Sequence, residues 1–93
     1  MTELRDQART LPDQPGVYVW RGEDDAVLYV GKAQSIRKRV ASYFRDEALD
    51  HKSRGLLARG VWIEPIVTAS ESEALLLEQR LVKRHLPPFN VRL

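Results

Sequence analysis

Three tyrosines and one arginine have the residue types and spacing to act on a phosphate. Tyr18 and Tyr29 lie in two segments rich in β-branched and aromatic residues, and Tyr43 follows Arg39 by four positions. A tyrosine hydroxyl can donate or accept a hydrogen bond, and a guanidinium binds phosphate oxygens through two parallel hydrogen bonds. Taken singly, each of these residues is more typical of packing or of a solvated surface.

Glu78 is the acidic residue that the helical pattern places among apolar side chains. On a helix with about 100° per residue, it falls near the middle of an apolar arc. An unpaired carboxylate in such a setting costs several kcal/mol, so it needs a cation, a hydrogen-bond network or a raised pKa. The cation could be a partner arginine within the core or a metal ion, and the pattern leaves both open. The arc consists of Ala74, Leu75, Leu77, Leu81, Val82 and Leu86.

Two further residues favour an anion site near the tyrosines. Lys32 comes just after the segment that holds Tyr29, and Gly31 lets a ligand approach the backbone closely. Arg39 and Tyr43 are neighbours one turn apart on one border of a helix. Together these residues outline a phosphate-binding pocket.

The elements that must position these residues follow the order α-ββ-α-α-β-α. Helices are predicted at 2–11, 35–44, 50–59 and 70–86, and strands at 16–21, 26–30 and 61–67. Ser35 and either Ser70 or Ser72 are suitable N-caps, and Pro65 favours an edge strand or a bulge. The pattern indicates an α+β fold in which helices cover a small sheet.

The first two strands are expected to form a hairpin with a four-residue loop at 22–25. In that register Tyr18 lies directly opposite Tyr29, and a shift by two residues would keep both on one face. Facing aromatic residues often only stabilise a sheet, so packing alone could explain the pair. The predicted tyrosine face holds Tyr18, Trp20, Val27 and Tyr29, and the aliphatic core face holds Val17, Val19, Leu28 and Val30.

Length, cysteine content and charge limit the kinds of protein that this chain can be. The chain has 93 residues, no cysteine and a formal net charge of +2, which predicts one domain without disulfides or cysteine nucleophiles. Basic residues gather at 32–59 and 79–93, and acidic residues at 1–31 and 60–78. This pattern suits a polyanion, although two solvated helix faces would give it too. No apolar run approaches a membrane span, so we expect a cytoplasmic protein.

Three spaced motifs resemble the GIY-YIG nuclease family, and within it the N-terminal domain of the UvrC branch. They are "PGVYVW" at 15–20, "LYVGKAQSIRKRVASYF" at 28–44 and "TASESEALLLEQRLVKRHLPPFNVRL" at 68–93. Val17 and Val30 replace the isoleucines of the family name, and His85 and Phe89 replace tyrosines that are usual in this branch. The resemblance implies a three-stranded antiparallel sheet, formed by the hairpin and a third strand and surrounded by helices.

The resemblance also implies a role for each candidate site residue. It makes Glu78 the only protein ligand of a single Mg²⁺ or Mn²⁺ ion, and Arg39 the clamp on the scissile phosphate. Tyr18, Tyr29 and Tyr43 would line the site of attack. Free tyrosine titrates near pH ~10, so a tyrosine base needs a cation beside its phenolate. We expect Tyr29 to be the base with Lys32 as that cation, although Tyr18 could take the role. Predicted DNA contacts are Gly31, Lys32, Arg37, Lys38, Arg39 and Asn90.

The function implied is metal-dependent incision of damaged duplex DNA on the 3′ side of a lesion, in bacterial nucleotide excision repair. A UvrB-type partner would bind parts of the parent protein other than this domain. We expect residues 1–93 to be a single nuclease domain, most simply one taken from a longer repair protein. Two alternatives are a small free-standing nuclease and a non-catalytic nucleic-acid-binding module. A missing Glu78, Arg39 or Tyr29 would have favoured the module.

Overall fold

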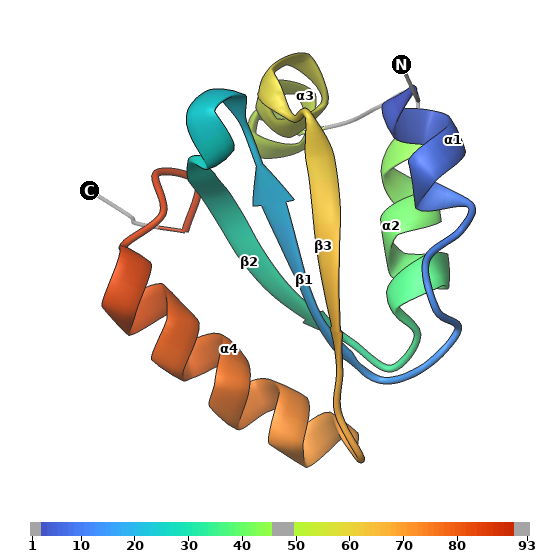
Figure 1. The fold of residues 1–93 in the computed structure, drawn as a ribbon, viewed down its shortest axis with the longest axis vertical. Coiled ribbons are helices and arrows are strands. Elements are labelled where there is room, and N and C mark those ends of the chain that lie inside the picture. Colours follow the sequence, from blue (N-terminus) through green and yellow to red (C-terminus); the bar gives the residue numbers. More distant parts are fainter. Residues whose placement is uncertain (1–2, 46–49, 91–93) are drawn as a thin grey trace.

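The protein folds into a three-stranded antiparallel sheet with helices on both sides (Figure 1). The computed structural model describes residues 3–45 and 50–90. The sheet has the strand order β2-β1-β3. The α-ββ-α-α-β-α order predicted from the sequence is confirmed. The elements are α1 (Leu4–Ala8), β1 (Gly16–Arg21), the 3₁₀ turn η1 (Glu23–Asp25), β2 (Val27–Ala33), α2 (Ile36–Arg45), α3 (His51–Arg59), β3 (Trp62–Val67) and α4 (Glu71–His85).

Local signals explain where these elements begin. The Ser70 side chain accepts a hydrogen bond from the Glu73 backbone N–H and starts α4, so Ser70 rather than Ser72 is the cap. Asp50 caps α3 in the same way. Pro65 lies in β3, which is an edge strand, as a residue without a backbone donor requires.

The hairpin register differs from the predicted one by two residues. Tyr18 pairs with Gly31 and Trp20 pairs with Tyr29, so the tyrosines lie diagonally across the strands and not directly opposite. They still share one face, because side chains alternate with a period of two.

A bulge in β2 changes which side chains of this strand share each face of the sheet. Trp20 pairs with Tyr29 but Arg21 pairs with Val27, which leaves Leu28 as the extra residue. Leu28 therefore packs with the aromatic cluster, and Val27 with the aliphatic one, which is the reverse of the prediction.

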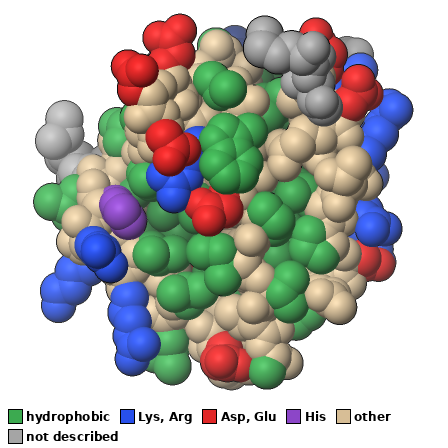
Figure 2. All heavy atoms as spheres, viewed as in Figure 1, with side chains coloured by type: hydrophobic (Ala, Val, Ile, Leu, Met, Phe, Trp, Pro, Cys, Tyr) green, Lys and Arg blue, Asp and Glu red, His purple; other side chains and the backbone are tan. Residues whose placement is uncertain are grey.

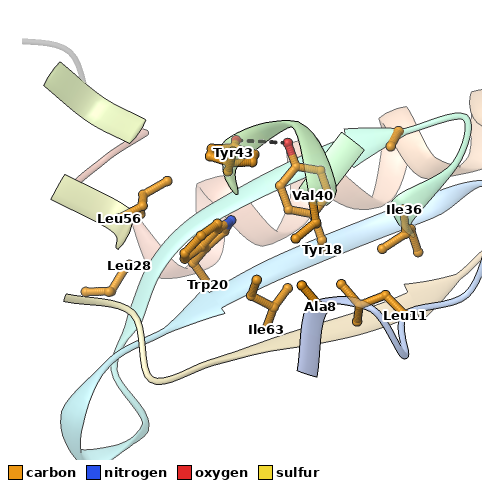
Figure 3. Close-up of a cluster of buried hydrophobic side chains, with 11 residues drawn as sticks. Ala8, Leu11, Tyr18, Trp20, Leu28, Ile36, Val40, Tyr43, Leu56 and Ile63 are labelled. Atoms are coloured by element: carbon orange, nitrogen blue, oxygen red, sulfur yellow. Dashed lines mark hydrogen bonds between the residues drawn. The ribbon is translucent and has the colours of Figure 1, made fainter. Parts of the chain in front are cut away.

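Both faces of the sheet are buried. The face that carries Tyr18 and Trp20 is covered by α1, α2 and α3 and holds the larger core cluster (Figure 3). The opposite face, which carries Val17, Val19 and Val30, packs against α4. The aliphatic face is core, as predicted, and the tyrosine face is part of the core as well.

Side-chain amides close both outer edges of the sheet. Gln7 of α1 donates to the Ile63 carbonyl at 2.7 Å and accepts from the Ile63 N–H at 2.9 Å, on β3. Asn90 makes the equivalent pair with Val30 on β2, at 3.0 and 2.8 Å. Each amide copies the hydrogen bonds of a neighbouring strand, so the edges present fewer free backbone groups to other chains.

The apolar arc of α4 is wider than the surface that the sheet buries. Ala74 is fully buried, but Leu75 is 39% exposed and Leu86 is 65% exposed, so these two leucines do not belong to the core. Figure 2 shows hydrophobic side chains gathered in the middle of this side of the molecule, over β3 and α4. Among residues 3–45 and 50–90, no helix is long and apolar enough to cross a membrane.

We predict that Gln7→Ala lowers the free energy of unfolding by about 1–3 kcal/mol, because it leaves a part-buried N–H and C=O of Ile63 without their partner. Urea denaturation followed by circular dichroism measures the change. The matched control is Gln79→Ala, which removes an exposed amide from α4. Equal stabilities of the two variants would show that Gln7 does not support the edge.

Candidate functional site

The predicted tyrosines come together on one face of the sheet. The ring centroid of Tyr18 lies 6.2 Å from that of Tyr29 and 6.3 Å from that of Tyr43. The Tyr18 and Tyr43 hydroxyls form a hydrogen bond of 3.2 Å, drawn as the dashed line in Figure 3. The hairpin supplies two of the rings, and α2 supplies the third.

Burial makes Tyr18 and Tyr43 poor proton acceptors. The Tyr18 side chain is 1% exposed and that of Tyr43 is 3% exposed. Burial raises the pKa of Tyr18 far above its ordinary value, and the neighbouring Tyr43 raises it further. Burial also raises the pKa of Tyr43, although its hydrogen bond with Tyr18 opposes this. Both hydroxyls therefore stay neutral around pH 7.

Gly31 has a structural role that the sequence analysis did not predict. It is buried and pairs with Tyr18 across the hairpin. A Cβ at this position would collide with the ring and hydroxyl of Tyr18, so only glycine leaves room for that ring. Gly31 therefore leaves space for the Tyr18 ring. This packing alone explains why glycine is needed at position 31, without a close approach of DNA to its backbone.

The cation beside Tyr29 is Lys52, a residue that the sequence analysis missed. The Lys52 Nζ donates to the Tyr29 hydroxyl at 3.3 Å and lies 4.4 Å from the ring centroid. Lys32 was the predicted partner, but it lies three positions after Tyr29 on a strand, where side chains point to opposite faces. The Lys32 Nζ instead lies 4.0 Å from the Glu71 carboxylate at the start of α4. The prediction of a Lys32–Tyr29 pair is wrong.

Arg39 stands at the border of the tyrosine cluster. Its guanidinium carbon lies 5.4 Å from the ring centroid of Tyr43 and its Nη1 donates to Ser42 at 3.3 Å. The nearby Tyr18 raises the pKa of Arg39, which outweighs the opposing effect of burial. Arg39 is exposed, so a permanent cation faces solvent beside the three tyrosines. This is the placement that a phosphate clamp requires.

Of the other predicted DNA contacts, some side chains are exposed to solvent and others make hydrogen bonds within the fold. Lys38 is exposed on α2. Arg37 is exposed as well, but its Nε donates to the Leu11 carbonyl at 2.7 Å and so ties α2 to the loop after α1. Asn90 uses its amide on the Val30 backbone. These two hydrogen bonds hold the C-terminal turn against β2, so Asn90 acts as a positioning residue.

Glu78 comes from the helix on the other face of the sheet. It is half-buried and shares the sheet-facing stripe of α4 with Ala74, Leu77, Leu81 and Val82. In the part of the chain that the structure describes, it has no hydrogen-bond or ion-pair partner, so the alternative of a partner arginine gains no support. A half-buried, unpaired carboxylate fits a hard divalent cation whose other ligands are water.

The described residues contain no group of three or more acidic, histidine or cysteine side chains that could hold a metal ion. A metal bound at Glu78 would therefore take at most two ligands of these types from this part of the chain. The arrangement places the carboxylate and Lys32 on one side of β2, and the tyrosines, Arg39 and Lys52 on the other. The predicted site residues therefore lie on both faces of the sheet.

Comparison with known proteins assigns the family. The model of the UvrC-like GIY-YIG domain matches residues 14–91. UvrABC system protein C of Methanothermobacter thermautotrophicus is 52% identical over 93 residues, which cover 100% of this chain and 16% of that protein. The protein of the same name from Psychrobacter sp. strain PRwf-1 is 52% identical over 91 residues, 97% of this chain and 15% of that protein. The chain thus spans a small part of the length of these relatives.

Solved structures agree with this assignment. The GIY-YIG N-terminal endonuclease domain of UvrC from Thermotoga maritima, solved with its catalytic magnesium, aligns with a TM-score of 0.86 at 32% identity. The alignment covers 98% of this chain and 100% of that domain. A tyrosine-to-phenylalanine variant of that domain, bound to its catalytic divalent cation, aligns with a TM-score of 0.87 at 31% identity, over 99% of this chain and 100% of that one. The predicted fold is confirmed, and the chain belongs to the UvrC-like GIY-YIG domain family.

Proposed function

We propose that this chain is a metal-dependent endonuclease domain that hydrolyses a phosphodiester bond of DNA. The observation that carries the proposal is the contact of 3.3 Å between Lys52 and the Tyr29 hydroxyl, on the layer that also presents Arg39. It combines a group that can lose a proton with a cation that stabilises the resulting charge. The related domain from Thermotoga maritima is an endonuclease with a catalytic divalent cation, which supports the same reaction here.

Each residue of the site has a distinct task in the proposed reaction. Tyr29, as phenolate, accepts a proton from the attacking water, and Lys52 stabilises that phenolate. Arg39 binds the phosphate oxygens, on which negative charge is concentrated in the transition state. Tyr18 and Tyr43 stay neutral and hold the geometry, which favours Tyr29 over Tyr18 as the base.

Glu78 would hold one divalent ion, Mg²⁺ or Mn²⁺, with water as the remaining ligands. When bound, such an ion neutralises charge on the leaving oxygen of an in-line displacement. Lys32 lies on the same side of β2, where its contact is with Glu71 at the start of α4.

We further propose that the domain works within a longer protein of the UvrC type and makes the 3′-side incision in nucleotide excision repair. The 52% identity to a protein of which this chain covers 16% supports this placement. The substrate would then be damaged duplex DNA in the bacterial cytoplasm. A UvrB-type partner would dock on other parts of the parent protein.

Glu78→Gln should reduce divalent-dependent nicking of duplex DNA by orders of magnitude while the far-UV spectrum stays unchanged. The amide has the shape of the carboxylate but is a far poorer ligand for a hard cation. Glu23→Gln, in the exposed η1 turn, is the matched control. Nicking by Glu78→Gln at the rate of the control would remove Glu78 from the metal site, and loss of folding would favour a structural role.

Arg39→Ala should lower turnover by roughly 10²–10³-fold, because a preorganised charge is lost from the transition state. The melting temperature should change little, since Arg39 is exposed and an exposed charge adds little to stability. Arg39→Lys should restore activity only in part because lysine lacks the planar fork. Arg54→Ala on α3 is the control. A large loss of stability with normal turnover per folded molecule would contradict the clamp.

The pH dependence of cleavage should separate the two lysines. If Tyr29 is the base, the rate rises with pH as its phenolate forms, and Tyr29→Phe abolishes this rise while keeping the ring. Lys52→Met should move the rise to higher pH, because the stabilising ammonium is gone. Lys32→Met is the matched control and should leave the position of the rise unchanged. A shift in Lys32→Met but not in Lys52→Met would overturn the assignment.

A further inference from the structure

A groove between α1 and α2 gathers four arginines around one aromatic ring. Its volume is about 420 Å³, and its lining includes Arg5, Arg9, Arg37, Arg45 and Phe44. The rest of the lining is made of alanines from the two helices. Small-ligand sites commonly have volumes of ~300–1,000 Å³, so the groove is large enough for one nucleotide.

The groove lies apart from the catalytic cluster. Arg39 and Tyr43 occupy one flank of α2, whereas Arg37, Phe44 and Arg45 occupy the flank that faces α1. Figure 1 shows α1 and α2 together on one side of the sheet, with α4 on the other. Helix α2 therefore presents positive charge both on the side that borders the tyrosines and on the side that faces α1.

The charge of the groove calls for an anionic occupant. All of its basic residues are arginines, whose planar forks bind phosphate oxygens with two hydrogen bonds. One of the four is already used, since Arg37 donates to the Leu11 carbonyl. Among residues 3–45 and 50–90, the Arg9 guanidinium makes only a long, exposed contact with Asp6, at 3.9 Å, so it has hydrogen bonds to offer.

The aromatic ring adds a requirement that phosphate alone does not meet. The Arg5 guanidinium carbon lies 5.9 Å from the centroid of the Phe44 ring, and the ring is only partly buried. Unpaired bases stack on aromatic rings and on guanidinium planes, whereas bases inside a duplex cannot reach them. A ring among guanidiniums therefore matches one unpaired nucleotide, with its base on Phe44 and its phosphates on the arginines.

We propose that the α1–α2 groove binds an unpaired nucleotide of a DNA strand, outside the catalytic cluster. The inference rests on the proposed DNA substrate and extends it, because it assigns a second contact that selects single-stranded character. An acidic protein segment would satisfy the arginines but would leave Phe44 without a stacking partner.

The test measures binding of a fluorescein-labelled twelve-nucleotide oligothymidylate and of a duplex of equal length, in EDTA, at several salt concentrations. Arg9→Ala with Arg45→Ala is compared with the control pair Arg80→Ala with Arg84→Ala, which removes the same charge from exposed positions of α4. We expect the groove pair to weaken single-strand binding about tenfold and to lower the salt slope by roughly 1.4, at about 0.7 per phosphate contact. The control pair should change affinity less than twofold.

Phe44→Leu tests stacking while it retains apolar packing against the core. We expect it to weaken binding of the single strand several-fold and that of the duplex little. Equal losses in the groove and control pairs, an unchanged affinity in Phe44→Leu, or equally tight competition by a hexaglutamate peptide would overturn the proposal. Because EDTA prevents cleavage, groove binding without any nuclease activity in Mg²⁺ would disprove only the proposed function. Cleavage without groove binding would disprove only this inference.

Discussion

The hydrogen bond between the hydroxyls of Tyr18 and Tyr43 joins the central strand of the sheet to α2, and the rest of the site depends on it. Both side chains are buried, and an unpaired buried hydroxyl costs roughly 1–3 kcal/mol. Each hydroxyl therefore constrains the position of the other. Because Arg39 lies one turn before Tyr43 on α2, the same bond holds the guanidinium at the border of the cluster.

Three local features of the edge strand β2 allow Tyr18 to reach Tyr43. The bulge at Leu28 turns that side chain into the aromatic core. Gly31 makes room for the Tyr18 ring. Asn90 satisfies the outer N–H and C=O of Val30, so the C-terminal turn covers an edge that would otherwise be open. Helix α4 then packs against the same strand and carries Glu78.

Local chemistry made much of this fold predictable. Ser70 and Asp50 cap their helices, and Pro65 lies on an edge strand, because each effect depends on near neighbours in the chain. The bulge at Leu28 was not predictable, since alternation alone assumes a regular ladder. Lys52 was missed because α3 carries it to Tyr29 from 23 positions away, and no periodic pattern encodes that contact. The Lys32 prediction failed for a simpler reason, since residues three apart on a strand face opposite ways.

The central claim is that Tyr18 and Tyr43 form a buried, neutral pair, whereas Tyr29, the proposed base, contacts Lys52. The most direct test is an NMR titration of the chain labelled with ¹³C at the tyrosine ζ carbon, with resonances assigned by Tyr→Phe substitution. As the pH rises, the Tyr18 and Tyr43 resonances should stay in place through the range near pH ~10 in which free tyrosine titrates, because burial raises the pKa of both. Movement of the Tyr18 or Tyr43 resonance at or below that range would contradict the account.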